Sequence, residues 1–195
     1  MKLLLATTSR GKIREQRISL AGLDLELVTL ESWLELDPPV EPGPSFLDNA
    51  IIKALYYHRA TGLVAVGEDS GLVIDALGGE PGIRSARWLG DDTPYDIKNA
   101  NVLEKLRDVA ADDRSARYVS SVVLADDDEI AFTTEGICEG RIAFESRGDG
   151  GFGYDPIFFY PPFKATMAEL SPEQKNRVSH RGQAMAKLRA FLAAR

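Results

Sequence analysis

Apolar residues are grouped along this chain in short runs that alternate with longer segments of helical periodicity. The short runs are rich in Leu and Val and are bounded by polar, Gly or Pro residues, which is typical of buried strands. In the first eighty residues this pattern predicts strands at 2–6, 24–29, 63–67 and 71–77. The Pro-rich segment 37–44 between them is incompatible with regular structure.

Capping residues mark where helices begin and end. Gly22 suits a left-handed helix end, Ser45 opens a segment that resembles a capping box, and Thr93 precedes Pro94 as an expected N-cap. The helices that these signals predict cover 11–21, 45–60, 93–109 and 182–192, with a further capped start at Ser171-Pro172-Glu173-Gln174.

The stretch 115–144 has a different pattern, with β-branched and aromatic runs separated by the turn sequences ADDD and CEG. We expect an antiparallel meander there and a last strand at 156–160. Together the elements predict the α/β class, with a mixed β-sheet flanked by helices. We expect a single two-lobed domain over 1–195, with an active-site cleft between the lobes.

Composition and charge restrict the classes of function. The 195 residues are 44% hydrophobic and 27% charged, and no apolar run approaches the roughly 20 residues of a membrane helix. The net charge of −7 argues against coating nucleic acid, since phosphate contacts need clustered cations. The single cysteine, Cys138, lies in a strand-like run and is expected to be buried rather than catalytic. We therefore expect a cytoplasmic protein with neither a nucleic-acid nor a membrane partner.

A polar loop follows the first predicted strand and consists of Thr7, Thr8, Ser9, Arg10, Gly11 and Lys12. Hydroxyl groups, the free N–H groups of a helix start and a lysine together suit a phosphate group. An ordinary strand–helix connection with an exposed lysine explains the same residues equally well.

A second loop, 148–153, matches the glycine spacing of dinucleotide-binding folds. The strand-like sequence after it excludes that fold, which requires a helix at this point. A glycine loop that presents Phe152, Tyr154 and Asp155 to a nucleotide base is one interpretation. A glycine-rich hairpin with aromatic residues in the core is the other.

Carboxylates and basic residues supply the remaining candidates. Glu68 and Asp69 are expected to end an apolar strand beside Gly71, a position where α/β proteins hold Mg²⁺, and Glu41 is a third acid. His180 lies at a helix start downstream of Lys175, which suits either an anion site or an ordinary capped helix. His58 is expected to be structural, and the acids at 91–92 and 126–128 to be solvated turns.

Six motifs in one order resemble the inosine/xanthosine triphosphate pyrophosphatase family. They are A-T-x-x-x-G-K-x-x-E, E-x-G-x-S-F-x-x-N-A-x-x-K-A, D-S-G-L, G-G-x-P-G-x-x-S-A-R, F-G-Y-D-P and S-H-R-G, and they span 6–184. The resemblance implies an elongated two-lobed α/β fold with an elongated mixed β-sheet, usually as a homodimer. It also implies an enzyme that uses Mg²⁺ to hydrolyse ITP, dITP and XTP to the monophosphate and pyrophosphate. The first loop departs from the family's usual T-G-N, because Thr8 and Ser9 replace Gly and Asn.

The resemblance also assigns roles to residues. Asp69 would be the general base, and Glu41 and Asp69 would hold Mg²⁺ with Glu68 as a possible further ligand. The polyphosphate would contact the loop from Thr7 to Lys12 and Lys53. The nucleoside would be surrounded by Ser70, Phe152, Gly153, Tyr154, Asp155, Lys175, His180 and Arg181. We expect Arg181 to donate a hydrogen bond to the 6-oxo oxygen of the base. The 6-amino group of adenine is itself a donor, so it would face the guanidinium without forming a hydrogen bond.

Two other functions remain open at this point. A pyrophosphatase for pyrimidine or modified triphosphates would have a similar architecture. Activity measured on a panel of substrates would distinguish it from a pyrophosphatase for deaminated purine triphosphates. A nucleotide-binding protein without activity would be consistent with the altered loop at Thr8 and Ser9. The presence of Glu41, Lys53, Asp69 and Lys175 favours an enzyme.

Overall fold

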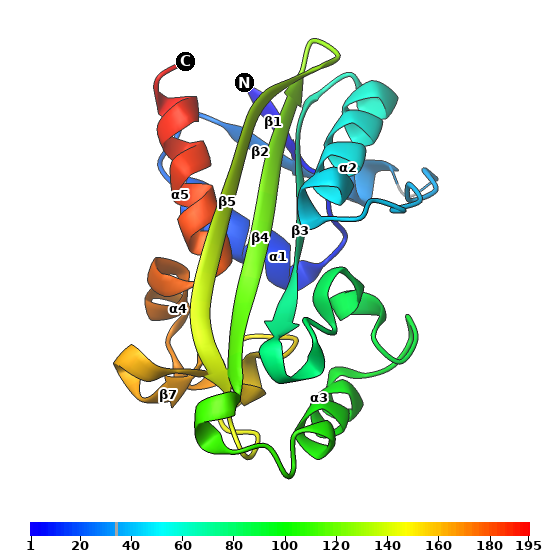
Figure 1. Cartoon of the computed structure of the whole chain (residues 1–195). Helices are drawn as coiled ribbons and strands as arrows, with labels where there is room; N and C mark the ends of the chain where they lie inside the picture. Colours follow the sequence, from blue (N-terminus) through cyan, green and yellow to red (C-terminus); the bar gives the residue numbers. More distant parts are fainter. Residues whose placement is uncertain (34) are drawn as a thin grey trace. The chain divides into compact units, whose positions relative to one another are not determined.

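The computed structural model describes residues 1–33 and 35–195 and shows an α/β protein with a mixed seven-stranded sheet (Figure 1). In sheet order the strands are β2 (Glu26–Thr29), β1 (Lys2–Leu5), β3 (Val64–Ile74), β4 (Ser115–Asp126), β5 (Glu129–Ile142), β6 (Phe158–Tyr160) and β7 (Ala165–Thr166). β1 pairs in parallel with β2 and β3, whereas β6 pairs antiparallel with β5 and β7. The predicted fold class is therefore confirmed.

The helices begin close to the residues that the capping signals indicate. They are α1 (Arg10–Leu20), α2 (Phe46–Thr61), α3 (Tyr95–Lys105), α4 (Pro172–Val178) and α5 (His180–Ala193). Ser45 caps α2 by accepting from the backbone N–H of Asp48 at 3.2 Å, and Gly62 ends that helix in the left-handed region. The capped start predicted at Ser171 is confirmed, and it takes the form of a capping box at the start of α4.

The chain divides into two compact units. Unit 1 contains Met1–Ser70, Ser120–Gly136 and His180–Arg195, and unit 2 contains Gly71–Val119 and Ile137–Ser179. The long strands β3, β4 and β5 contribute residues to both units.

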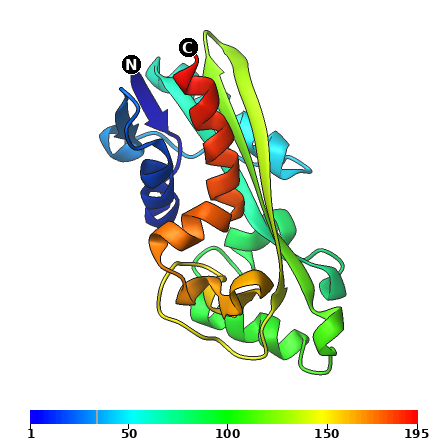
Figure 2. The same ribbon diagram turned by 90° about the vertical axis from the view of Figure 1, so that its left-hand side faces the viewer.

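The core of unit 1 follows from the alternation of side chains along β1. Leu3 and Leu5 pack with Leu188 of α5, whereas Leu4 packs with Tyr57 of α2. Successive side chains of a strand point to opposite faces, so the sheet of this unit is covered on both faces. α1 packs beside α5 on one face, and α2 lies on the other (Figures 1 and 2).

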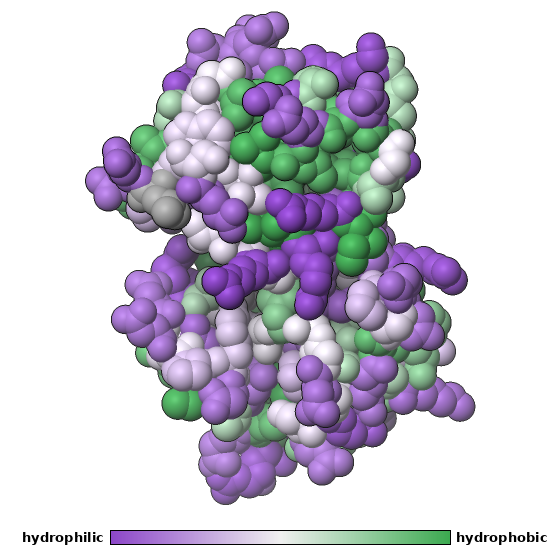
Figure 3. Space-filling model, turned by 180° about the vertical axis from the view of Figure 1, so that it is seen from behind, coloured by the Kyte–Doolittle hydropathy of each residue, from purple (hydrophilic) through white to green (hydrophobic). Residues whose placement is uncertain are grey.

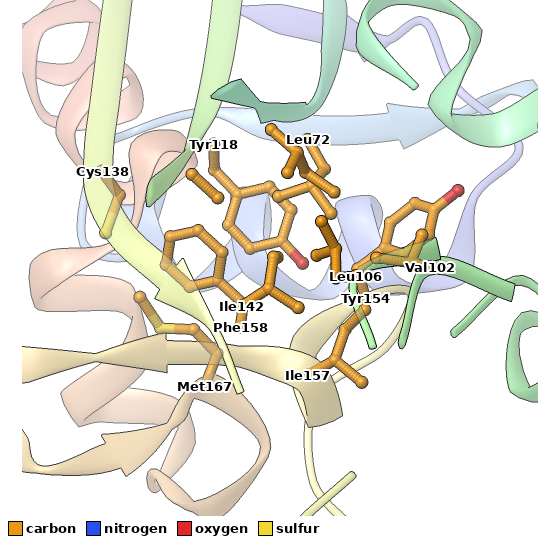
Figure 4. Close-up of a cluster of buried hydrophobic side chains, with 12 residues drawn as sticks. Leu72, Val102, Leu106, Tyr118, Cys138, Ile142, Tyr154, Ile157, Phe158 and Met167 are labelled. Atoms are coloured by element: carbon orange, nitrogen blue, oxygen red, sulfur yellow. The ribbon is translucent and has the colours of Figure 1, made fainter. Parts of the chain in front are cut away.

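Unit 2 has a core of its own, in which aromatic and aliphatic side chains from several elements meet (Figure 4). Tyr118 of β4 and Phe158 of β6 lie with their ring centroids 4.4 Å apart, and Leu106 and Tyr154 belong to the same cluster. Cys138 is part of this core and is buried, as the sequence predicts. Burial raises the pKa of its thiol to about 12, which leaves no reactive thiolate near neutral pH.

Two predicted strand breaks are wrong. The segments 63–67 and 71–77 belong largely to one strand, β3, which continues through Gly71. The sequence CEG is not a turn, because β5 runs unbroken from Glu129 to Ile142. A glycine inside a strand permits a turn but does not require one when neighbouring strands supply hydrogen bonds.

The predicted N-cap at Thr93 is also wrong. Helix α3 begins at Tyr95 after Pro94, without a side-chain cap, and the Thr93 hydroxyl instead donates to the carbonyl of Leu89 at 2.8 Å. His58 is structural as expected: its Nδ1 lies 2.7 Å from the Leu63 carbonyl, and its Nε2 accepts from the Asp128 N–H at 3.1 Å.

One face of the molecule carries hydrophilic side chains around a smaller apolar area (Figure 3). In the part of the chain that the structure describes, no helix is long and apolar enough to cross a membrane.

Candidate active site

A lysine of α2 holds two carboxylates together in unit 1. Lys53 Nζ donates to Glu41 Oε2 at 3.1 Å and to Asp69 Oδ1 at 3.0 Å. Asp69 Oδ2 also lies 3.5 Å from the amide nitrogen of Asn49, one turn earlier on α2. The three charged side chains of this group are largely but not fully buried, with 11 to 20% of each side chain exposed.

The donor set of this group suits a hard divalent cation. Mg²⁺ is commonly bound by one or two carboxylates, with waters and substrate phosphate oxygens completing the octahedron. Glu41 and Asp69, which converge on one ammonium group, provide such a pair. Among the described residues there is no cluster of three or more His, Cys, Asp or Glu that could hold a metal. The protein would therefore supply only part of the coordination.

Glu68 has entirely different surroundings from Asp69. Its carboxylate is fully buried and accepts from Arg181 Nε at 2.7 and 3.0 Å, from Gln16 at 2.6 Å and from Ser120 at 3.0 Å. Burial would raise the pKa of Glu68, but the charges of Arg181, Lys12 and His180 and the Gln16 hydrogen bond hold it well below the usual range.

The alternation of β3 explains this difference and corrects two expectations. Glu68 and Asp69 lie within β3 rather than at a strand end, so their side chains point to opposite faces of the sheet. Asp69 faces α2, whereas Glu68 faces α1 and α5. Glu68 therefore does not join Glu41 and Asp69 as a third metal ligand; its acceptors are occupied by Arg181, Gln16 and Ser120.

Arg181 is the centre of the buried network on this second face. Its Nη1 donates to Glu15 at 2.5 Å and its Nη2 donates to the Ser70 hydroxyl at 3.0 Å, in addition to the Nε bonds to Glu68. Arg181 and His180 are both buried at the start of α5, the helix start that the sequence predicts. The guanidinium thus joins residues that are as many as 166 positions apart in the chain.

Several residues of these networks were not selected from the sequence. They are Glu15, Gln16, Asn49 and Ser120. Glu15 and Asn49 are letters of the first two motifs, so a signal for them existed. Gln16 and Ser120 stand in a helix and a strand without any motif, and only the fold shows that they meet Glu68.

The loop before α1 has the geometry of a helix start. Ser9 is the N-cap, and its hydroxyl accepts from the backbone N–H of Lys12 at 3.5 Å, while Thr7 Oγ1 accepts from the Ser9 N–H at 3.2 Å. Lys12 is half-buried, and desolvation lowers the pKa of its ammonium group. Glu68 raises this pKa and Lys53 lowers it further, so Lys12 belongs electrostatically to the charged network of unit 1.

A second group of predicted site residues lies in unit 2. Asp155 is buried and accepts from Lys175, from the Phe152 N–H at 2.7 Å and from the Tyr118 hydroxyl at 3.4 Å. Lys175 Nζ also lies 4.6 Å from the centroid of the Phe152 ring. Gly151 has a φ of 70°, and a Cβ there would lie 2.2 Å from Asp155 Oδ2.

Two of the three side chains that this glycine loop was expected to present are buried. Tyr154 is buried and donates to the carbonyl of Ser85 at 2.9 Å, and Asp155 is equally enclosed. Asn99 of α3 donates to the carbonyl of Gly153 at 3.2 Å and so fixes the loop from the other side. Phe152 is the half-exposed aromatic residue of the loop, and the buried residues hold it in place.

The fold and these groups define an α/β protein with a carboxylate–lysine site suited to a metal-bound polyphosphate. The chain belongs to the Ham1 family, whose family model matches residues 3–191. It is 47% identical to a dITP/XTP pyrophosphatase of Thermus thermophilus, covering 100% of this chain and 91% of the relative. A dITP/XTP pyrophosphatase of Xylella fastidiosa is 45% identical, with 98% and 96% covered. The solved structure of a HAM1 protein from Coxiella burnetii matches with a TM-score of 0.90 at 36% identity, over 100% of both chains.

Proposed function

We propose that this protein is a Mg²⁺-dependent pyrophosphatase that hydrolyses deaminated purine nucleoside triphosphates (ITP, dITP and XTP) to monophosphate and pyrophosphate. The observation that carries this proposal is the Glu41–Lys53–Asp69 group, in a chain whose full-length relatives are named dITP/XTP pyrophosphatases. Removal of deaminated purines from nucleotide pools is the corresponding role in the cell. We further propose a cytoplasmic homodimer.

In this proposal, water attacks the α-phosphorus, the bond to the bridging oxygen breaks, and pyrophosphate leaves. Asp69 orients the water and accepts its proton, since it is a carboxylate held in a fixed position by Lys53 and Asn49. A bound Mg²⁺ on Glu41 and Asp69 would neutralise charge on the phosphate oxygens. Lys53 keeps the two carboxylates together against their mutual repulsion.

The loop that precedes α1 is proposed to bind the polyphosphate. Thr7, Thr8, Ser9, Arg10 and Gly11 lie at or beside the start of a helix of 11 residues, whose N–H groups favour an anion. Lys12 adds a positive charge in a partly desolvated position, where a phosphate interacts with it more strongly than in water.

The residues proposed to contact the nucleoside have unequal roles. Phe152 offers a half-exposed ring for stacking on the base, and Lys175, Asp155 and Tyr154 act chiefly by holding that loop. Gly153, Ser70, His180 and Arg181 remain proposed neighbours of the nucleoside. The Arg181 guanidinium is already engaged by Glu68, Glu15 and Ser70, so we propose that it acts mainly by positioning these groups.

Replacement of the proposed base tests this function directly. Asp69→Asn should reduce pyrophosphate release from ITP by at least about a hundredfold, the typical contribution of a positioned general base. Unchanged circular dichroism and thermal unfolding would show that the fold is retained. Asp127→Asn in the exposed β4–β5 turn is the matched control and should keep full activity. An active Asp69→Asn enzyme would remove Asp69 from the role of base.

A further inference from the structure

A cavity of about 330 Å³ lies within unit 2 and contains none of the residues assigned above to catalysis or nucleotide binding. Its polar lining is Arg114, Arg141, Arg147 and Glu145, and its aromatic lining is Phe144 and Phe159. The volume lies in the range of cavities that bind small molecules.

Arg114 is a buried cation whose partners are neutral. It directly precedes β4 and donates hydrogen bonds to backbone carbonyls. Its Nε donates to that of Ile142 at 2.9 Å, its Nη1 to that of Leu106 at 2.6 Å and its Nη2 to that of Ala143 at 2.8 Å. Only 2% of the residue is exposed, and desolvation lowers the pKa of its guanidinium. Among the described residues, its hydrogen-bond acceptors are backbone carbonyls, including that of Val109 at 3.4 Å from Nη1, and none is a carboxylate.

A buried charge without a counterion is energetically costly, and an anion in the adjoining cavity would compensate it. The other two arginines add positive charge at the cavity rim. Arg141 meets Asp112 at 3.4 Å and Arg147 meets Glu169 at 3.8 Å, both as exposed pairs of the kind that contribute little. Three arginines against one glutamate line this cavity in a chain whose net charge is −7.

The aromatic lining indicates the other half of the ligand. Phe144 is 66% exposed, although it is a large apolar side chain, and the Arg114 guanidinium lies 4.4 Å from its ring centroid. Arg147 lies 5.6 Å from the ring centroid of Phe159. Two aromatic rings held by cations provide surfaces on which a planar group can stack.

We propose that this cavity binds a small organic anion, with a phosphate or carboxylate group beside Arg114 and a planar ring against Phe144 and Phe159. The size of the cavity, the uncompensated charge of Arg114 and the exposed ring of Phe144 are the three observations that carry the proposal.

Isothermal titration calorimetry with phenyl phosphate, inorganic phosphate and benzoate tests the site. The two aromatic anions should bind, and inorganic phosphate should bind at least about tenfold more weakly, because stacking on an aromatic side chain contributes about that factor or more. Backbone amide shifts of Ala143 and Phe144 in NMR spectra should move on addition of phenyl phosphate. Binding that is stronger for inorganic phosphate, or shifts confined to unit 1, would overturn the proposal.

Variants at the rim avoid disturbing Arg114, whose hydrogen bonds hold the backbone. Phe144→Ala should weaken phenyl phosphate binding at least about tenfold, the factor expected for a stacked ring. Arg147→Gln should also weaken it, because a positive charge is lost from the cavity rim. Asp69→Asn, which alters the proposed catalytic group, should leave this binding unchanged. Equal binding by all variants, or loss in Asp69→Asn alone, would contradict the assignment. The oligomeric state should also be measured by sedimentation. If Phe144→Ala converts a dimer into a monomer, Phe144 belongs to a subunit interface, and the proposed ligand site is overturned.

Discussion

Two neighbouring acids on β3 illustrate how much depends on the residue scale. Asp69 faces Lys53 and remains partly exposed, whereas Glu68 faces Arg181 and is fully buried. The sequence shows that both are acids beside an apolar run, but it does not show that the strand continues past them. Because both acids lie within the continuous strand β3, their side chains point to opposite faces of the sheet and meet different partners.

Replacing Glu68 should reveal its structural role. Glu68→Gln leaves the Arg181 charge only partly compensated, so we expect the free energy of unfolding to fall by about 3–5 kcal/mol. The folded-state pKa of Glu68 is lowered, so its contribution is complete above the unfolded-state pKa of about 4.3 and is lost as the pH falls below it. Urea unfolding of wild type between pH 3 and 7 should therefore show this loss below about pH 4.3, and Glu68→Gln should lack it.

Glu139→Gln on the exposed face of β5 is the control for that experiment and should unfold like the wild type. Equal stability and an equal pH dependence for Glu68→Gln would contradict the buried network as described.

The lowered pKa of Lys12 predicts a pH dependence of catalysis. Because desolvation favours its neutral form, Lys12 loses its proton at a lower pH than an ordinary lysine, and its attraction for the polyphosphate declines with it. The ratio kcat/KM of the free enzyme should therefore fall at alkaline pH. In Lys12→Arg, which keeps its charge, this fall should move to higher pH. If wild type and Lys12→Arg have the same pH profile of kcat/KM, the decrease at alkaline pH belongs to a group other than Lys12.

At the scale of elements, helices were predicted more accurately than strands. Caps such as Ser45 and Ser171 are local signals, and the structure shows both in use. The ends of β3 and β5 depend on pairing with neighbouring strands, which no local pattern records. The errors at Gly71 and at the sequence CEG have this common cause.

The contact between β3 and α2 gives a prediction at this scale. A Cβ at Gly67 would lie 2.3 Å from the Ala50 carbonyl and 2.6 Å from the Ala54 nitrogen, both of α2. Gly67→Ala should therefore displace the helix that carries Lys53 and cost about 1–3 kcal/mol of stability, as overpacking typically does. Thermal unfolding and ITP turnover should both decrease. The exposed substitution Thr133→Ala on β5 should change neither. A Gly67→Ala protein of normal stability would refute this close contact.

At the scale of the whole molecule, the candidate site is assembled from distant parts of the chain. Unit 1 unites residues from the first, middle and last segments, which is why Glu15 of α1 meets Arg181 of α5. The motifs contain Glu41, Lys53 and Asp69, which the structure brings into contact. They could not predict which side chains become buried partners, because burial depends on the packing of all elements together.

The most direct test of the proposed function is pyrophosphate release from ITP, XTP, dITP, GTP, ATP and dTTP, each with and without Mg²⁺. We predict release that requires the metal and is fastest with ITP, XTP and dITP. Preferential release from dTTP would instead indicate a pyrimidine triphosphate pyrophosphatase. Release from none of the six would contradict an enzyme and favour a nucleotide-binding protein, with the altered Thr8–Ser9 loop as the first cause to examine.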